Sequence, residues 1–155
     1  MHERHITLTL SDEAATLSLG AALAAALKPG TVVWLEGDLG AGKTTLVRGL
    51  LHAAGEAGAV KSPTYTLVEV HLISGLYFYH FDFYRFNQAE EYLDAGLDEY
   101  FSGNGICLVE WPDKARPYLA DADLRIRLQV ADVGRRVELE SCSERGAVCL
   151  AAVTF

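Results

Sequence analysis

Eight consecutive residues, 37–44, have the types and the spacing needed to bind a phosphorylated ligand. They read Gly-Asp-Leu-Gly-Ala-Gly-Lys-Thr and fit the pattern GxxxxGK[ST]. The glycines allow the backbone to curl so that successive N–H groups point inward at phosphate oxygens. Lys43 is suited to reach the β- and γ-phosphates, and the hydroxyl of Thr44 is suited to bind Mg²⁺. The pattern therefore predicts a phosphate-binding loop, or P-loop, for a magnesium-bound nucleoside triphosphate.

The base of that nucleotide is less strongly encoded. A guanine-specific site of the small-GTPase type carries an Asn-Lys-x-Asp segment, and neither Asn87 nor Asn104 is followed by lysine. We therefore expect ATP, by elimination of GTP and without a positive signal for adenine.

Two acidic residues stand at the ends of apolar strands, where a P-loop site needs a carboxylate. Glu110 ends the apolar run 106–109, and Asp82 lies in the segment 79–85, Tyr-His-Phe-Asp-Phe-Tyr-Arg. A neighbouring Mg²⁺ stabilises a carboxylate as an anion, whereas an unpaired carboxylate buried in a core is costly. Both acids can serve, one toward the metal and the other toward a water molecule. The competing interpretation of each is a solvated acid at a strand end.

A hydroxyl-rich segment, Ser-Pro-Thr-Tyr-Thr at 62–66, follows the loop. Switch loops of GTPases use such hydroxyls to sense the γ-phosphate, although composition alone favours a proline turn that leads into a strand. Trp111 is expected in the core or in an interface in preference to a base-stacking position. Arg85, Arg135 and Arg136 are candidates to lie near phosphate or adenine, with a solvated surface position as the alternative.

The elements that must position these residues alternate between strand and helix in the first part of the chain. Strands are expected at 6–10, 31–35, 66–72, 76–83, 106–109, 124–130, 136–139 and 147–153. Helices are expected at 12–27 with Ser11 as the N-cap, at 44–54, at 88–101 with a break at Gly96, and briefly after Pro112. This pattern predicts an α/β fold, a three-layer P-loop domain over residues 1–155 with a mixed parallel and antiparallel sheet.

Composition limits the possible classes of protein. The 155 residues include 13 Lys plus Arg and 21 Asp plus Glu, a formal net charge of −8, and half of them are hydrophobic. The length and apolar content suit one folded domain, and the acidic balance disfavours a free-standing nucleic-acid binder. The spacing of the three cysteines fits no zinc motif and favours free thiols. We expect no membrane span and no signal peptide, and hence a cytoplasmic protein.

Four motifs together resemble one bacterial family. The segments GDLGAGKTT (37–45), KSPTYTLVE (61–69), YHFDFYR (79–85) and LVEWP (108–112) have the order and spacing of the TsaE family, formerly YjeE. The resemblance implies an ATPase needed to make threonylcarbamoyladenosine, the modified adenosine beside the anticodon in tRNAs that read codons starting with A. It also implies that the protein acts on a complex of TsaD and TsaB, and that it meets tRNA indirectly through that complex.

The resemblance also implies roles for individual residues. Lys43, Asp82 and Glu110 are expected to be catalytic, Thr44 to bind Mg²⁺, and the two acids to lie at the metal, with the acid that touches it left open. Trp111 matches a tryptophan implicated in function, and the segment 62–66 becomes a switch loop. The residues expected to contact ATP are Gly37, Asp38, Leu39, Gly40, Ala41, Gly42, Lys43, Thr44, Thr45 and, on the adenine side, Arg135.

Two other functions use the same kind of phosphate loop and stay open as alternatives. A small-molecule kinase needs an acceptor pocket and usually an arginine-bearing lid, and the sequence has no evident lid insertion. A regulator that binds a nucleotide without hydrolysing it has no need of two strand-end acids.

Overall fold

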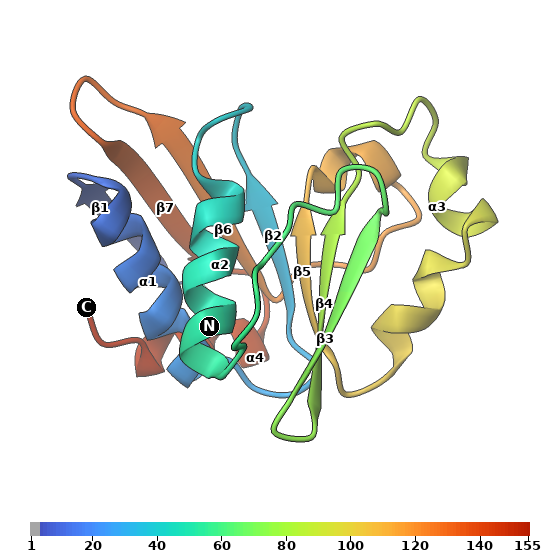
Figure 1. Ribbon diagram of the computed structural model, residues 1–155, viewed down its shortest axis with the longest axis horizontal. Helices are drawn as coiled ribbons and strands as arrows, with labels where there is room; N and C mark the ends of the chain where they lie inside the picture. Colours follow the sequence, from blue (N-terminus) through green and yellow to red (C-terminus); the bar gives the residue numbers. More distant parts are fainter. Residues whose placement is uncertain (1–3) are drawn as a thin grey trace.

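A computed structural model describes residues 4–155, which form a seven-stranded sheet with helices against both faces (Figure 1). The strands lie side by side in the order β1-β7-β6-β2-β5-β4-β3. Their bounds are β1 (His5–Leu10), β2 (Val32–Glu36), β3 (Val68–Ile73), β4 (Leu76–Asp82), β5 (Ile106–Glu110), β6 (Leu124–Val130) and β7 (Arg135–Ser141). The predicted α/β fold with a mixed sheet is confirmed. The first three residues of the expected domain lie outside the described residues.

The direction of the strands determines where a site can form. The four central strands β6, β2, β5 and β4 are parallel, whereas β7, β1 and β3 pair with antiparallel neighbours. The carboxyl ends of the parallel strands therefore meet at one edge of the sheet, which is where ligands bind in open α/β folds. The loops that follow β2, β4 and β5 all begin at this edge.

The helices are divided between the two faces of the sheet. Their bounds are α1 (Glu13–Ala26), α2 (Lys43–Ala54), α3 (Glu90–Asp94) and α4 (Glu144–Ala152), with 3₁₀ helices η1 (Leu97–Ser102) and η2 (Pro112–Ala115). One core lies between the sheet and α1, α2 and α4, and a second, more aromatic core lies between the opposite face and α3, η1 and η2. No helix within residues 4–155 is long and apolar enough to cross a membrane.

Helices α1 and α2 lie next to each other on the same face, and glycines permit their close approach (Figure 1). A Cβ atom added to Gly20 of α1 would lie 2.2 Å from the carbonyl oxygen of Leu46 in α2. A Cβ atom added to Gly49 of α2 would lie 2.3 Å from the carbonyl oxygen of Leu17 in α1. Helix α2, which follows the P-loop, is thus packed closely against α1, with one glycine of each helix against the backbone of the other.

Two predictions about helix ends have different outcomes. The break at Gly96 is confirmed, because Gly96 has φ 70° and separates α3 from η1. The N-cap prediction for α1 is wrong by one residue. Asp12, and not Ser11, is the cap, and its carboxylate accepts a hydrogen bond of 2.8 Å from the backbone N–H of Ala15.

The strand expected at 147–153 is wrong, because this segment belongs to α4. The side chain of Ser143 caps the helix by accepting a hydrogen bond of 3.0 Å from the backbone N–H of Gly146. Gly146, Cys149 and Leu150 are the buried residues of the helix, a spacing of three and four that is helical. A short apolar run does not by itself distinguish the two periods, and the cap that decides between them lies before the run.

Candidate functional site

The predicted P-loop connects β2 to α2 at the edge where the parallel strands end. Gly37 has φ 148°, and a Cβ atom there would lie 2.4 Å from the carbonyl oxygen of Leu128, so the position requires glycine. Gly42 has φ 110° and directly precedes α2. Because α2 begins at Lys43, the positive end of its dipole adds to the loop's attraction for an anion.

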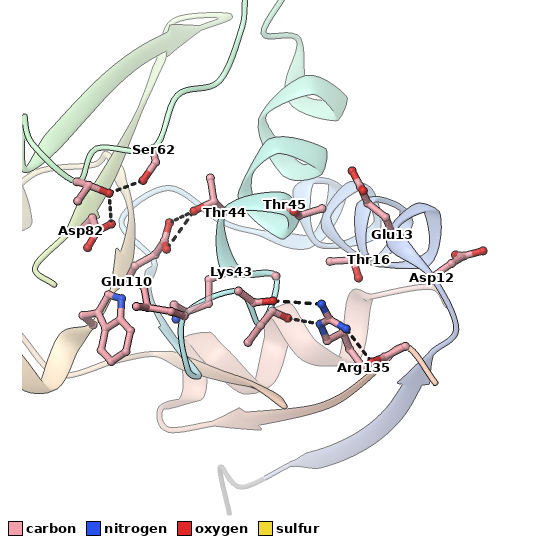
Figure 2. A pocket seen from close by; sticks show the side chains of 17 residues that line it. Asp12, Glu13, Thr16, Lys43, Thr44, Thr45, Ser62, Asp82, Glu110 and Arg135 are labelled. Atoms are coloured by element: carbon pink, nitrogen blue, oxygen red, sulfur yellow. Dashed lines mark hydrogen bonds between the residues drawn. The ribbon is translucent and has the colours of Figure 1, made fainter. Parts of the chain in front are cut away.

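A pocket of about 310 Å³ opens beside this loop (Figure 2). Its walls come from the start of α1, the P-loop, the segment 62–64, the ends of β4 and β5, and the start of β7. The predicted site residues that line it are Leu39, Gly40, Ala41, Gly42, Lys43, Thr44, Thr45, Asp82, Glu110 and Arg135. The tertiary structure thus brings together residues that are far apart in the chain.

Gly37 and Asp38 belong to the loop but serve Lys43 through their carbonyl groups. The Lys43 ammonium donates hydrogen bonds to the carbonyl oxygen of Gly37 and, at 3.1 Å, to that of Asp38. It also lies 4.2 Å from the centre of the Trp111 ring, a cation–π contact. Burial lowers the pKa of Lys43, and the nearby carboxylates, Glu110 foremost, oppose that shift. An incoming phosphate would add negative charge and favour the charged form further.

Thr44 and Glu110 are joined directly in the pocket (Figure 2). The hydroxyl of Thr44 lies 3.0 Å from Oε2 and 3.2 Å from Oε1 of the Glu110 carboxylate, to which it donates. The side chain of Glu110 is almost completely buried, at 4% exposed. The hydroxyl at the start of α2 and the carboxylate at the end of β5 therefore form one oxygen-rich corner.

Asp82 stands next to Glu110 because the two are paired in the register of β4 and β5. Its Oδ1 accepts a hydrogen bond of 2.9 Å from the backbone N–H of Tyr84, and its Oδ2 accepts one of 3.1 Å from the hydroxyl of Thr64. The hydroxyl oxygens of Ser62 and Thr64 are 2.7 Å apart. The hydroxyl-rich segment predicted from the sequence thus contacts one of the two predicted acids.

Burial raises the pKa of the Asp82 carboxyl, and the neighbouring Glu110 raises it further. The hydrogen bonds from Tyr84 and Thr64 act in the opposite direction but do not cancel the shift. Two carboxylates side by side in a buried place repel each other, and a cation between them relieves the repulsion. This corner is therefore electrostatically prepared for a positive ion.

The donors in this corner fit Mg²⁺. The ion prefers hard oxygen ligands and is usually bound through one or two carboxylates together with the phosphates of its substrate. Within residues 4–155, no group of three or more His, Cys, Asp and Glu side chains is arranged to hold a metal ion alone. One threonine hydroxyl and one or two carboxylates thus make a partial shell, which phosphate oxygens would complete.

Arg135, at the start of β7, lies against the carbonyl groups of the loop. Its guanidinium group donates hydrogen bonds of 3.0 Å to the carbonyl oxygen of Ala41 and 3.1 Å to that of Gly40 (Figure 2). A third bond, of 2.9 Å, goes to the carbonyl oxygen of Gly134. The first two bonds hold the carbonyl groups of Gly40 and Ala41 against Arg135. Arg135 lines the pocket, and its hydrogen bonds go to the loop and to Gly134, so the expected contact with adenine stays a prediction.

Two aromatic residues near the site have distinct surroundings. Trp111 adopts the left-handed conformation, with φ 59°, and its ring packs against Tyr84 with centroids 5.0 Å apart. It lines the pocket beside the P-loop and also packs, partly buried, against the second, more aromatic core, in keeping with the expected core position. Tyr65 is 80% exposed, and its hydroxyl accepts a hydrogen bond of 2.8 Å from Arg85.

Sequence reasoning missed several residues of the site. Asp12, Glu13 and Thr16 at the start of α1 and Gly134 before β7 all line the pocket. Their positions depend on the packing of α1 and β7 beside the loop, and no local motif marks them. His80 was also missed, although it lies in the motif YHFDFYR, and its ring contacts Glu110.

Comparison with known protein families matches residues 10–137 to the family described as "Threonylcarbamoyl adenosine biosynthesis protein TsaE". The chain belongs to the TsaE family. The match covers the P-loop, both strand-end acids and the start of β7, and it confirms the resemblance seen in the four motifs.

Individual TsaE proteins are similar over three quarters of the chain or more. A tRNA threonylcarbamoyladenosine biosynthesis protein TsaE from Haemophilus influenzae is 41% identical over 152 residues, covering 95% of this chain and 96% of that protein. The protein of the same name from Bacillus subtilis is 43% identical over 116 residues, covering 75% and 72%. The crystal structure of YdiB from Bacillus subtilis matches with a TM-score of 0.82 at 31% identity, covering 98% and 96%. The TsaE relatives are therefore similar to this chain in sequence, and the YdiB structure is similar to it in fold as well.

Proposed function

We propose that this protein is a P-loop ATPase that supports the formation of threonylcarbamoyladenosine in tRNA, acting through a complex of TsaD and TsaB. The observation that carries the ATPase part is the junction of Thr44, Glu110 and Asp82 beside the phosphate loop. The names of the relatives support the pathway, because TsaE proteins of two bacteria carry it in their names. The two partners are inferred from the resemblance of the four motifs.

Each residue of the site has a distinct task in this proposal. The loop amides and Lys43 bind the phosphates, and Thr44 and Glu110 hold Mg²⁺, which when bound neutralises charge on the transferring phosphoryl group. Asp82 accepts hydrogen bonds and so orients a water molecule close to the phosphates. Lys43 exchanges its carbonyl partners in the loop for phosphate oxygens.

The segment 62–66 fits the role of a switch loop. Ser62 and Thr64 line the pocket, and Thr64 contacts Asp82, so loss of the γ-phosphate would change the contacts of this segment directly. Tyr65 is exposed, is not among the residues that line the pocket, and packs on Arg85, with the guanidinium carbon 4.3 Å from the ring centre. A movement of Thr64 would therefore shift an exposed aromatic residue on the surface.

The charged face of β6 and β7 supports an indirect relation to tRNA. Arg125 makes two hydrogen bonds, of 2.8 and 2.9 Å, to the carboxylate of Glu36. Arg127 lies 3.2 Å from Glu140, and Arg136 lies 3.4 Å from Glu138. Arginines that are already paired with carboxylates are less available to phosphates, and the whole chain has a net charge of −8. Retention of tRNA by the isolated protein at physiological salt would contradict this part.

Phosphate release from ATP, measured with the protein alone and with the TsaB–TsaD pair, tests the proposal. We expect Lys43→Ala, Asp82→Ala and Glu110→Ala each to lower turnover at least about tenfold, because each removes a charged contact to the transition state. Asp94→Ala, an exposed acid on α3, is the matched control and should retain normal turnover. The modified nucleoside is quantified in the same reactions.

The same assay separates the alternatives. Near-normal turnover in a folded Glu110→Ala protein would refute the role of that acid. Phosphate transferred to a small molecule, with none released to water, would indicate a kinase. ATP that stays bound and intact even with both partners present would indicate a regulator without catalysis.

A further inference from the structure

The imidazole of His80 is completely buried beside the predicted metal corner. His80 lies on β4, two residues before Asp82, and its side chain is 0% exposed. Its Nε2 atom lies 2.6 Å from Oε2 of Glu110 on the adjacent strand β5. The role proposed above for Glu110 does not by itself require a histidine here, so the contact calls for an explanation.

The surroundings of the ring assign the proton of Nε2. The other nitrogen, Nδ1, is buried and has no hydrogen-bond partner among the described residues. A bare Nε2 facing a carboxylate oxygen at 2.6 Å would bring two lone pairs together, so Nε2 carries a hydrogen and donates it. This holds whether the ring carries one proton or two, and the donation is therefore independent of the charge on His80.

The hydrogen bond leaves Glu110 with a defined orientation. Oε2 is held by the ring from β4, while both carboxylate oxygens are within 3.2 Å of the Thr44 hydroxyl. A glutamate side chain has three rotatable bonds, and without the ring its carboxylate would be held mainly by the hydroxyl that also has to bind the metal. The ring of His80 supplies a hydrogen bond to Glu110 from a group that is not itself a metal ligand.

We propose that His80 is a positioning residue that holds the Glu110 carboxylate in place for Mg²⁺. The inference rests on the function proposed above. Partners that orient metal ligands through a hydrogen bond typically change metal affinity or activity about 10- to 100-fold when they are removed. The same magnitude is expected here in the Mg²⁺ requirement, with no change in the affinity for nucleotide measured without Mg²⁺.

Two variants of His80 separate the hydrogen bond from the volume of the ring. The amide nitrogen of glutamine reaches about as far from the backbone as Nε2 does, whereas that of asparagine corresponds to Nδ1. His80→Gln should therefore restore the donor to Glu110, and His80→Asn should not. ADP binding is measured by calorimetry at a series of Mg²⁺ concentrations and again in EDTA, and folding is followed by thermal denaturation.

We expect His80→Asn to raise the half-saturating Mg²⁺ concentration about 10- to 100-fold and His80→Gln to stay within about threefold of the parent protein. ADP affinity in EDTA should be the same in all three. In a Glu110→Ala background, His80→Asn should have no further effect, because the carboxylate that accepts the bond is already absent. His80→Phe replaces His80→Asn if the asparagine variant does not fold.

Three results would overturn the inference. The first is an unchanged Mg²⁺ requirement in the variant without a donor, and the second is a glutamine variant as impaired as the asparagine variant. The third is an equal loss of ADP affinity with and without Mg²⁺, which would indicate a packing role. If the parent protein itself shows no Mg²⁺-dependent ADP binding, the proposed function fails together with the inference. If the parent protein does show such binding, any of the three results above overturns only the role of His80.

Discussion

Replacing Gly20 by alanine tests how closely α1 and α2 approach each other. The added Cβ would lie 2.2 Å from the carbonyl oxygen of Leu46 and 2.8 Å from the backbone nitrogen of Leu50, whereas contacts below 3.0 Å are essentially never found. Both neighbours are backbone atoms inside α2 and cannot rotate away as a side chain can. The helices must therefore separate, by about 0.8 Å or more at this point, for the methyl group to fit.

Two opposing effects decide the size of the change. Alanine is favoured over glycine inside a helix by about 1 kcal/mol. Overpacking a close contact costs about 1–3 kcal/mol, and the upper end applies here because the obstructing atoms belong to the backbone. The net loss for Gly20→Ala is then about 2 kcal/mol of unfolding free energy. For a chain of this size that corresponds to a fall in Tm of about 4–8 °C.

Thermal and urea denaturation of the nucleotide-free protein measure this loss. Gly103→Ala is the matched control, since a Cβ there meets no heavy atom within 4 Å and the residue has φ −112°, which alanine adopts freely. The control should stay within about 2 °C of the parent protein. A Gly20→Ala protein as stable as the parent, or more stable, would refute the close backbone contact between the helices.

Three further predictions concern charge, loop position and thiol reactivity. Because burial raises the pKa of Asp82, ionisation of its carboxylate lowers the stability of the folded chain as pH rises through that raised pKa. Asp82→Asn should therefore increase Tm at about pH 7, and the increase should shrink toward about pH 4. A lower Tm of the variant at neutral pH would contradict this. Arg135→Ala should weaken the binding of ATP and of tripolyphosphate equally, by about tenfold, because it frees the loop carbonyls of Gly40 and Ala41. Calorimetric titrations measure both affinities, and a loss confined to ATP would instead indicate that Arg135 contacts the adenine base. Cys142 should react faster than the other two thiols in a titration with a disulfide reagent, because it is exposed whereas Cys107 and Cys149 are buried. Partial burial and the neighbouring Glu140 raise the pKa of Cys142, but burial raises that of Cys107 to about 12. A Cys142→Ser protein that keeps the fastest phase would contradict this.

Much of the site was predictable because its strongest signals are local. A P-loop binds phosphate with amides that are consecutive in the chain, so the residue types and the spacing from Gly37 to Thr44 already predict the binding surface. The acids Asp82 and Glu110 were found because each ends a recognisable apolar run. Strands and helices that are long and periodic were predicted for the same reason, whereas the short apolar run 147–153 was assigned to the wrong class.

The contacts between distant residues were decided by the tertiary structure alone. β4 lies next to β5 and is parallel to it, and this pairing sets Asp82 beside Glu110 and brings the His80 ring against the carboxylate. Arg135 reaches the P-loop across nearly a hundred positions of sequence, since β7 folds back beside β6. The chain sequence by itself determined which groups could bind a phosphate and a metal. Which of them meet was decided by strand order and helix packing, because these depend on the burial of apolar side chains throughout the domain and not on any one motif.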